Sequence, residues 1–225
     1  MPTQQTSRAA KKSKLKWNYR LRLQAADQSY PEQLHEMMRD PHPGVRRVVA
    51  QRIDLDRLPE MMLDEDYAVR WEVAKRISPD RLPELMRDKN LLVRRAVADR
   101  ADPSHLPEMM RDYEVEIRCV VAQRIDPSRL PEMMDDTHWE VRCETAHRIS
   151  IDRLPEMLTD NDSLVRRVVA QRIEIAWLPK MMKDENWPVR WEVASRIESR
   201  FLVGMLVVET HPTVVKYLQN RIRSQ

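Results

Sequence analysis

A stripe of apolar residues at helical spacing recurs along most of this chain. Val45, Val49 and Ile53 are spaced four residues apart, so they lie on one face of an α-helix. The surrounding sequence VRRVVAQRI returns letter for letter at 165–173, and close variants of it start every 24 residues between and after these two copies. A fixed period over so much of a chain predicts stacked helical units, each burying its apolar face only against its neighbours.

A proline-containing segment precedes each of these helices. In DPSHLP (102–107) and DPSRLP (126–131), Asp followed by Pro is typical of a helix start, but a second proline arrives four residues later. Because this proline has no N–H to donate and clashes with the carbonyl four residues back, a continuous α-helix is unfavourable. The pattern therefore predicts a turn and a short helix, 3₁₀ in part, with Leu and Met side chains in the core. The eight units begin at Leu34, Leu58, Leu82, Leu106, Leu130, Leu154, Leu178 and Leu202.

The shared pattern L-P-E-M-M-x-D-x4-V-R-x-x-V-A-x-R-I resembles the repeat of the leucine-rich repeat variant family, and its D-x4-V-R core is also similar to HEAT-type repeats. The match covers residues 34–201 closely and 202–225 loosely. The resemblance implies an all-α fold, a right-handed superhelical solenoid of about eight 24-residue repeats, each a short (partly 3₁₀) helix plus an α-helix. The positions that recur at one spacing in seven units are those of Asp40, Val45, Arg46, Ala50, Arg52 and Ile53.

Members of this family often carry an N-terminal four-cysteine iron–sulfur module and sit in bacterial nitrogen-fixation gene neighbourhoods. Residues 1–33 of this chain contain no cysteine, so we predict no cofactor. The resemblance alone suggests a role as an accessory protein in nitrogen fixation or redox metabolism.

Charge and hydropathy divide the chain into four predicted parts: a disordered basic tail (1–14), an N-terminal cap (15–33), seven repeats (34–201) and a divergent capping repeat (202–225). The first 30 residues carry a net charge of +6 and the whole chain +3, so the body is slightly acidic. No apolar run approaches the ~20 residues of a membrane span, and the N-terminus lacks an apolar signal segment. We therefore expect a cytoplasmic protein without membrane association.

Two rows of arginines and rows of acids repeat with the units. The guanidinium groups could form a stripe that tracks phosphates, or they could pair internally with the acids, which can also cap helices. The slightly acidic body favours internal pairing. The first arginine row is Arg46, Arg70, Arg94, Arg118, Arg142, Arg166 and Arg190, and the second is Arg52, Arg76, Arg100, Arg124, Arg148, Arg172, Arg196 and Arg221. The main acidic row is Asp40, Asp64, Asp88, Asp112, Asp136, Asp160 and Asp184.

Four tryptophans are candidate partner-binding residues. Trp71 and Trp191 occupy the outward position that holds Arg47 in the first unit, while Trp139 and Trp187 lie just before their helices. Exposed tryptophans are enriched at binding hot spots. The alternative is that they only pack locally, for example as cation–π partners of basic side chains.

Catalytic and metal-binding patterns are missing. Cys119 and Cys143 share one position in adjacent units, too far apart for a disulfide and too few for a metal centre. The six histidines share no repeat position, and the chain has only two glycines, so no phosphate loop can be built. We therefore predict a protein that is not an enzyme and holds no metal.

The last unit departs most from the pattern. Val208 stands at the acidic position and Val215 at the arginine position, which makes this unit unusually apolar. Its surface could mediate self-association.

The sequence thus predicts a non-enzymatic repeat scaffold that binds a partner macromolecule, most readily a protein. The alternative is a nucleic-acid-binding protein that uses the arginine rows and the basic N-terminal segment. The basic residues of that segment, which could equally contact an acidic partner, are Lys11, Lys12, Lys14, Lys16, Arg20 and Arg22.

Overall fold

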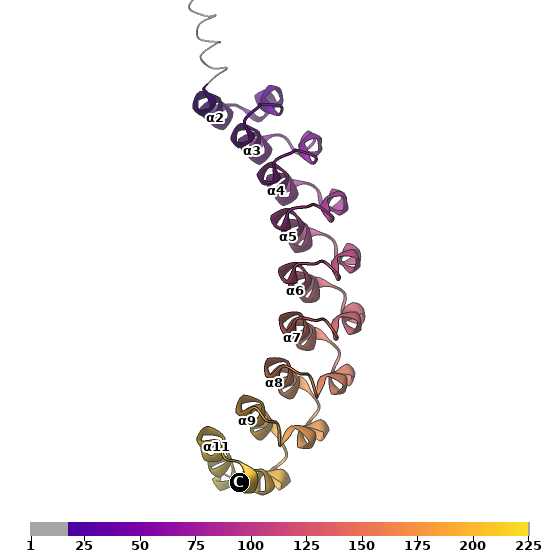
Figure 1. Ribbon diagram of the computed structural model, residues 1–225, viewed down its shortest axis with the longest axis vertical. Coiled ribbons are helices and arrows are strands. Elements are labelled where there is room, and N and C mark those ends of the chain that lie inside the picture. Colours follow the sequence, from indigo (N-terminus) through magenta and orange to yellow (C-terminus); the bar gives the residue numbers. More distant parts are fainter. Residues whose placement is uncertain (1–17, 225) are drawn as a thin grey trace, which may run out of the picture. The chain divides into compact units, whose positions relative to one another are not determined.

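The computed structural model describes residues 18–224, and every regular element within them is a helix. The chain divides into an N-terminal unit, Met1–Glu108, and a C-terminal unit, Met109–Gln225. Both units are helical-repeat arrays in which α-helices alternate with 3₁₀ helices, labelled η (Figure 1). None of the described helices is both long enough and apolar enough to cross a bilayer.

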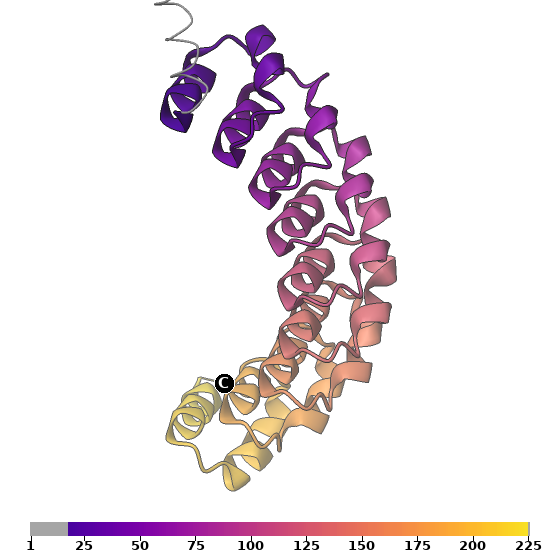
Figure 2. The ribbon, with the colours of Figure 1, turned by 45° about the horizontal axis from the view of Figure 1, so that its top comes forward.

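In the N-terminal unit the α-helices pack one on the next, and each of η1 to η3 packs on the α-helix that follows it. The α-helices form one row and the η helices a second row beside it (Figure 2). The elements are α2 (Tyr19–Gln28), η1 (Pro31–Met37), α3 (Pro43–Arg52), η2 (Leu58–Met61), α4 (Tyr67–Arg76), η3 (Pro79–Leu85) and α5 (Leu91–Arg100), followed by η4 (Pro103–Met109), which ends at the unit boundary.

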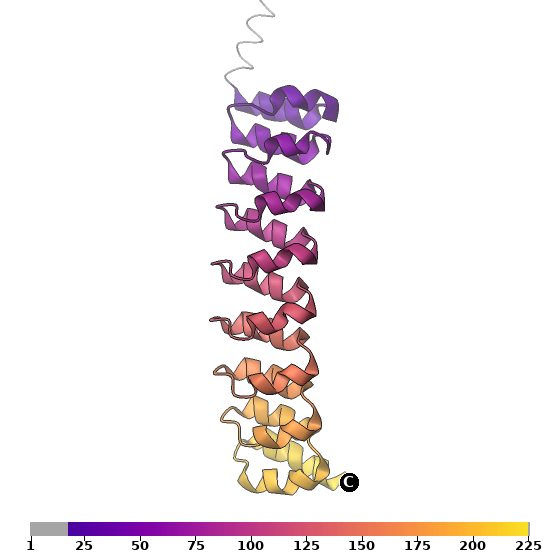
Figure 3. The same ribbon diagram turned by 90° about the vertical axis from the view of Figure 1, so that its right-hand side faces the viewer.

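The C-terminal unit repeats the same two rows, and Figure 3 views it from the side of the η helices. Its last α-helix packs on α9, with α10 beside it in the position of an η helix. The elements are α6 (Val115–Arg124), η5 (Pro127–Met133), α7 (Trp139–Arg148), η6 (Ile151–Met157), α8 (Ser163–Arg172), η7 (Ile175–Met181), α9 (Trp187–Arg196), η8 (Ser199–Phe201), α10 (Leu202–Val208) and α11 (Pro212–Arg223).

The predicted alternation of α- and 3₁₀ helices is confirmed. In η3 the proline Pro83 lies inside the helix, where it cannot donate the hydrogen bond that an α-helix needs. The chain instead closes three-residue turns, such as Arg81 N–H to Ser78 O (3.0 Å) and Met86 N–H to Pro83 O (3.3 Å). In η3 the internal proline therefore disfavours an α-helix.

The predicted apolar stripe forms the core of each unit. Val69 and Val73 of α4 are fully buried, as is Leu82 of the following η helix. Ala74 is also fully buried, and its small side chain allows neighbouring helices to approach closely. The core of each unit thus consists of equivalent side chains stacked from one repeat to the next.

Helix α2 is a degenerate copy of the repeating α-helix. Arg22 and Ala26 precede Arg46 and Ala50 by 24 residues, and α2 packs on α3 as the later α-helices pack on their successors. The repeat therefore starts one half-unit before Leu34. The predicted tail at 1–14 and the first residues of the predicted cap lie outside the described residues.

Thr145 is the one polar residue at the central valine position of the described α-helices 3 to 9. It is fully buried, and its hydroxyl donates to the carbonyl oxygen of Val141 (2.9 Å), which is the main-chain acceptor one turn back. Thr145→Val removes this buried hydroxyl and adds a buried methyl group, so we expect about 1 kcal/mol of added stability. The urea unfolding midpoint measures the change, and the reverse control Val169→Thr is expected to lower it. A lower midpoint for Thr145→Val would contradict the account.

Candidate functional site

The first arginine row pairs internally with the acidic row. Arg70 donates from Nε and Nη2 to both carboxylate oxygens of Asp88 in the next 24-residue repeat, at 2.6 and 2.9 Å. Its Nη1 donates to the main-chain oxygen of Asp64 in its own repeat (2.6 Å). All three guanidinium nitrogens therefore donate hydrogen bonds, and the side chains of Arg70 and Asp88 are each only 6% exposed. The same bidentate pairs are Arg22–Asp40, Arg46–Asp64, Arg118–Asp136, Arg142–Asp160 and Arg166–Asp184.

The acidic row also orders the start of each α-helix. Asp88 Oδ1 accepts the main-chain N–H of Asn90 (2.8 Å), and Asn90 in turn caps α5 by accepting the N–H of Leu92 (2.9 Å). Burial alone would raise the pKa of Asp88, but the hydrogen bonds from Arg70 and Asn90 lower it below its ordinary value. The arginine row, the acidic row and the helix caps therefore form a hydrogen-bonded network that joins neighbouring repeats.

The second arginine row caps helix C-termini. Arg76 donates to the carbonyl oxygens of Ala50 (2.6 Å) and Ile53 (2.8 Å), which end the α-helix of the preceding unit. Burial lowers the pKa of Arg76, and the nearby carboxylates of Asp54 and Glu72 offset this only in part. The equivalent contacts to the alanine carbonyl are Arg52–Ala26, Arg100–Ala74, Arg148–Ala122, Arg172–Ala146, Arg196–Ala170 and Arg221–Ala194.

Internal pairing, the interpretation favoured by charge balance, is thus confirmed for these arginines. A phosphate stripe along the first row has no support in residues 18–224, since those guanidiniums are bound to carboxylates and carbonyls. Of the basic N-terminal residues, Arg22 is engaged with Asp40 and Arg20 is exposed on α2. The four lysines, Lys11, Lys12, Lys14 and Lys16, lie outside the described residues.

The last repeat (202–225) keeps the arginine–carboxylate pairing through Glu209, a residue that the sequence analysis did not single out. Val208 was expected to leave the acidic position empty, but Glu209 takes it: both of its carboxylate oxygens accept from Arg190 at 2.7 Å. Glu209 also accepts the N–H groups of Thr210 and His211 (2.9 and 2.8 Å). Glu209 precedes His211 by two residues, as Asp40 precedes His42, so the one-residue insertion lies before Glu209 and brings its carboxylate into the acidic position.

Trp71 lies in a group of side chains held by a buried carboxylate. Glu72 is only 2% exposed and accepts hydrogen bonds from Gln51 (2.6 Å), Arg47 (3.2 Å) and Lys75 (3.1 Å). Burial would raise the pKa of Glu72, but these donors lower it below its ordinary value. Lys75 also lies 4.2 Å from the centroid of the Trp71 ring, which is half-buried.

The C-terminal unit contains an equivalent group, with Ser195 at the position of Lys75. Buried Glu192 accepts from Arg167 (3.0 Å) and Gln171 (2.8 Å), as Glu72 does from Arg47 and Gln51. Trp191 contacts Tyr217 of α11, with ring centroids 5.5 Å apart. The repeated letters R-x-x-x-Q in one helix and W-E in the next carry this pairing, so the sequence contained the signal.

An exposed aromatic residue lies one helical turn before each of these two tryptophans. Tyr67 precedes Trp71 in α4 and is 45% exposed, and Trp187 precedes Trp191 in α9 and is 41% exposed. Residues four apart are neighbours on a helix surface, so each unit displays an aromatic pair. Sequence reasoning missed Tyr67.

The other two tryptophan candidates have contacts of their own. Trp187 stacks on His211 with ring centroids 4.1 Å apart and planes 2° from parallel. Trp139 is half-buried, with its ring centroid 6.5 Å from that of His138. Trp139 and Trp187 are the first residues of α7 and α9, and not residues of the preceding loops as predicted. Trp139 therefore lies on a helix that carries neither of the two carboxylate-held groups.

Three histidines share the position before the α-helix, so the expectation that no two of the six would coincide was wrong. They are His42, His138 and His211, the N-cap residues of α3, α7 and α11. His42 Nδ1 accepts the N–H of Gly44 (3.1 Å), and its ring stacks on Tyr19 at 4.2 Å. His42 and His138 are four full periods apart, so the sequence already showed that they coincide, and only His211 was concealed by the one-residue insertion before it.

The two cysteines are half-buried, unpaired thiols on α6 and α7. Burial raises the pKa of Cys119 and Cys143, and nearby carboxylates such as Glu140 and Asp162 raise it further, to about 11 in both cases. Both thiols are therefore protonated at neutral pH and weakly nucleophilic.

The last repeat (202–225) exposes the apolar surface that the sequence predicted. Val203, Val207 and Val208 of α10 are 60%, 79% and 54% exposed. Self-association through this surface stays a prediction.

Comparison with known proteins finds similar solved structures. No family model matches the sequence, and no curated protein matches it. A solved structure described as a leucine-rich repeat variant with a novel repetitive protein structural motif is 30% identical, covering 85% of this chain and 81% of that chain with a TM-score of 0.80. The X-ray structure of YibA from Escherichia coli is 15% identical, covering 92% of this chain and 97% of that chain with a TM-score of 0.52, a likeness of fold alone.

Proposed function

The chain belongs to the leucine-rich repeat variant family, and from this premise we propose that it is a non-enzymatic scaffold that binds a partner protein. Stacked helical repeats present extended, rigid surfaces, and such surfaces commonly serve as binding scaffolds. The surface proposed here is the solvent-exposed face of the α-helical row, because it carries the aromatic pairs.

The observation that supports this proposal most is a patch that occurs once in each unit. We call it the aromatic patch: Tyr67, Trp71, Arg47 and Gln51 in the N-terminal unit, and Trp187, Trp191, Arg167 and Gln171 in the C-terminal unit. Buried Glu72 and Glu192 fix the Arg and Gln side chains, so the patch is ordered before any partner arrives.

Packing does not require a tryptophan at this position. The equivalent residue is Arg95 in α5 and Cys119 in α6, and both helices carry the same buried stripe. Tryptophan, tyrosine and arginine are the residues most enriched at protein-binding hot spots, because they combine large apolar area with polar groups. Two copies of the patch would also allow bivalent binding to a partner with two matching sites.

The test is the double variant Trp71→Ala with Trp191→Ala. Truncating a hot-spot tryptophan costs about 2 kcal/mol, so we expect partner capture to fall at least about tenfold for each lost patch. Capture from native-cell lysate, quantified by mass spectrometry, measures the loss, and circular dichroism checks that helical content is unchanged.

A matched control is Leu92→Ala with Leu164→Ala, one exposed leucine on the same row of each unit. This control should capture the same proteins as the unaltered chain. Equal capture by the tryptophan variant would remove the aromatic patch from the proposal, and loss of all capture after nuclease treatment would favour a nucleic-acid partner instead.

A further inference from the structure

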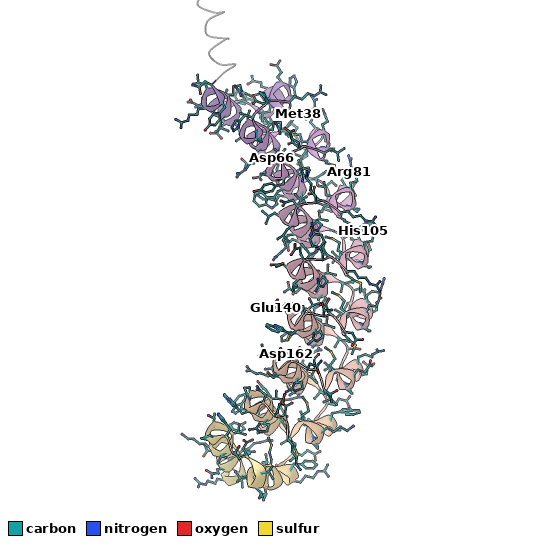
Figure 4. All side chains as sticks on the ribbon, in the orientation of Figure 1. Met38, Asp66, Arg81, His105, Glu140 and Asp162 are labelled. Atoms are coloured by element: carbon teal, nitrogen blue, oxygen red, sulfur yellow. The ribbon has the colours of Figure 1, made fainter. Side chains whose placement is uncertain are left out.

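Grooves separate successive η helices on the row opposite the aromatic patch. One, of about 680 Å³, lies between η1 and η2 in the N-terminal unit, and another, of about 760 Å³, lies between η6 and η7 in the C-terminal unit. Equivalent positions of the repeat line both grooves, so they can be compared residue by residue. Figure 4 shows side chains of the N-terminal unit on both rows, with Arg81 on the row of η helices and Asp66 on the row of α-helices.

The two grooves differ in charge at three equivalent positions. In the η1–η2 groove these are Arg57, Glu60 and Leu63, and Arg57 neutralises Glu60 through an ion pair of 2.7 Å. In the η6–η7 groove they are Trp177, Lys180 and Lys183. The same Arg–Glu pair recurs on η3, η5 and η6 as Arg81–Glu84, Arg129–Glu132 and Arg153–Glu156. In η1 and η4 the arginine position holds Gln33 and His105, but the glutamate is kept, so among η1 to η7 only η7 has a lysine in place of the glutamate.

The two lysines of the η6–η7 groove lack a carboxylate partner within the described chain. Lys180 Nζ lies 4.1 Å from the centroid of the Trp177 ring, and Lys183 is exposed on the loop after η7. The acids that line the groove are engaged by arginines. Asp160 pairs with Arg142, Asp184 and Glu185 pair with Arg166, and Glu156 pairs with Arg153.

Apolar surface lies beside these ammonium groups. Trp177, Leu158 and Pro155 are half-buried and line the groove, as does the buried Met181. A cation–π contact could replace the Arg–Glu pair for stability alone, but it would explain neither Lys183 nor the open face of the groove. Two unpaired cations beside an apolar floor match a segment with carboxylates flanking an apolar side chain.

We propose that the η6–η7 groove binds an acidic peptide segment of a partner protein. Carboxylates of the segment pair with Lys180 and Lys183, and an aliphatic or aromatic side chain between them lies against Trp177 and Leu158. This site uses no residue of the aromatic patch, so either proposal can fail without the other.

Charge decides between the possible occupants. The chain's own N-terminal segment is unsuited, because residues 1–17 contain five basic residues and no acid. A nucleic-acid backbone presents a charge at every phosphate and would run past Glu156, Asp184 and Glu185 as well as the lysines. A peptide can place carboxylates at the two lysines and neutral side chains elsewhere.

The experiment measures fluorescence anisotropy of a labelled twelve-residue peptide in which Asp and Glu flank a single Phe, with the full chain at low salt. The triple variant Trp177→Arg, Lys180→Glu, Lys183→Leu gives this groove the residues that the η1–η2 groove has at the three equivalent positions, which the same fold already accommodates. We expect at least tenfold weaker binding for this variant. A peptide with Gln and Asn in place of the acids should bind neither protein, and binding to the unaltered chain should weaken as salt rises.

The reciprocal variant is Arg57→Trp, Glu60→Lys, Leu63→Lys. It should create a second site and raise the stoichiometry from one peptide to two per chain. A photo-reactive Phe analogue in the peptide should cross-link within residues 155–185. Equal affinity for the η7 triple variant, cross-links confined to the basic N-terminal segment, or stronger competition by a single-stranded oligonucleotide than by unlabelled acidic peptide would each overturn the proposal.

Discussion

Replacing Arg70 with alanine is expected to lower the free energy of unfolding by about 3–5 kcal/mol, because removing one partner of a buried ion pair leaves the other charged and unpaired. Asp88 would lose both hydrogen bonds from the guanidinium in a site where it is 6% exposed. The carbonyl of Asp64 would lose its donor as well. Urea unfolding followed by circular dichroism measures the change.

The control is Arg57→Ala in the same unit. Arg57 pairs with Glu60, but their side chains are 45% and 51% exposed, and exposed pairs contribute about 1 kcal/mol or less. Arg70→Lys should lie between the two, because an ammonium cannot form the bidentate pair. If Arg70→Ala costs no more than Arg57→Ala, the network does not stabilise the stack in the way its burial indicates.

Local rules explain why so much of the fold could be predicted from the sequence. The spacing of Val45, Val49 and Ile53 specifies a helical face, and an internal proline such as Pro83 excludes an α-helix. Both effects act within about one helical turn, so they can be read from neighbouring letters. The fixed period then requires that each unit pack on the next.

Several features that escaped prediction depend on contacts between neighbouring 24-residue repeats. Arg76 caps carbonyl groups 26 and 23 residues earlier in the chain, and no rule of local spacing assigns such an acceptor. Helix α2 lies in the segment predicted as a cap, and its likeness to the repeat is weak because Gln28 stands where later helices carry the capping arginine. The shared position of His42 and His211 was hidden by a one-residue insertion.

The candidate site was predicted only in part for the same reason. Trp71 and Trp191 were chosen because they interrupt a polar position, which is a pattern visible in the letters. The carboxylate of Glu72, which orders the patch, was not among the candidate residues. Its burial arises from packing of α3 against α4, so the sequence could show the repeated letters but not the hydrogen bonds.

Glu209→Ala is expected to destabilise the C-terminal unit by about 3–5 kcal/mol, again because a buried partner loses its counter-charge. The Glu209 side chain is 1% exposed and its partner Arg190 is 14% exposed. The N–H groups of Thr210 and His211 at the start of α11 lose their acceptor in the same variant. Glu198→Ala is the control, since Glu198 pairs with Arg200 at the surface, and it should cost about 1 kcal/mol or less.

Acid should remove the difference between Glu209→Ala and the unaltered chain. Burial raises the pKa of Glu209, but the hydrogen bonds from Arg190 and from His211 N–H lower it below its ordinary value. A carboxyl whose pKa is lowered by folding contributes stability above its unfolded pKa of about 4.3 and loses that contribution as pH falls through the folded pKa. The gap between the two urea midpoints should therefore be widest near pH 7 and narrow steadily below about pH 4. A gap that stays constant down to pH 3 would show that Glu209 acts through packing, and that its charge contributes nothing to the stack.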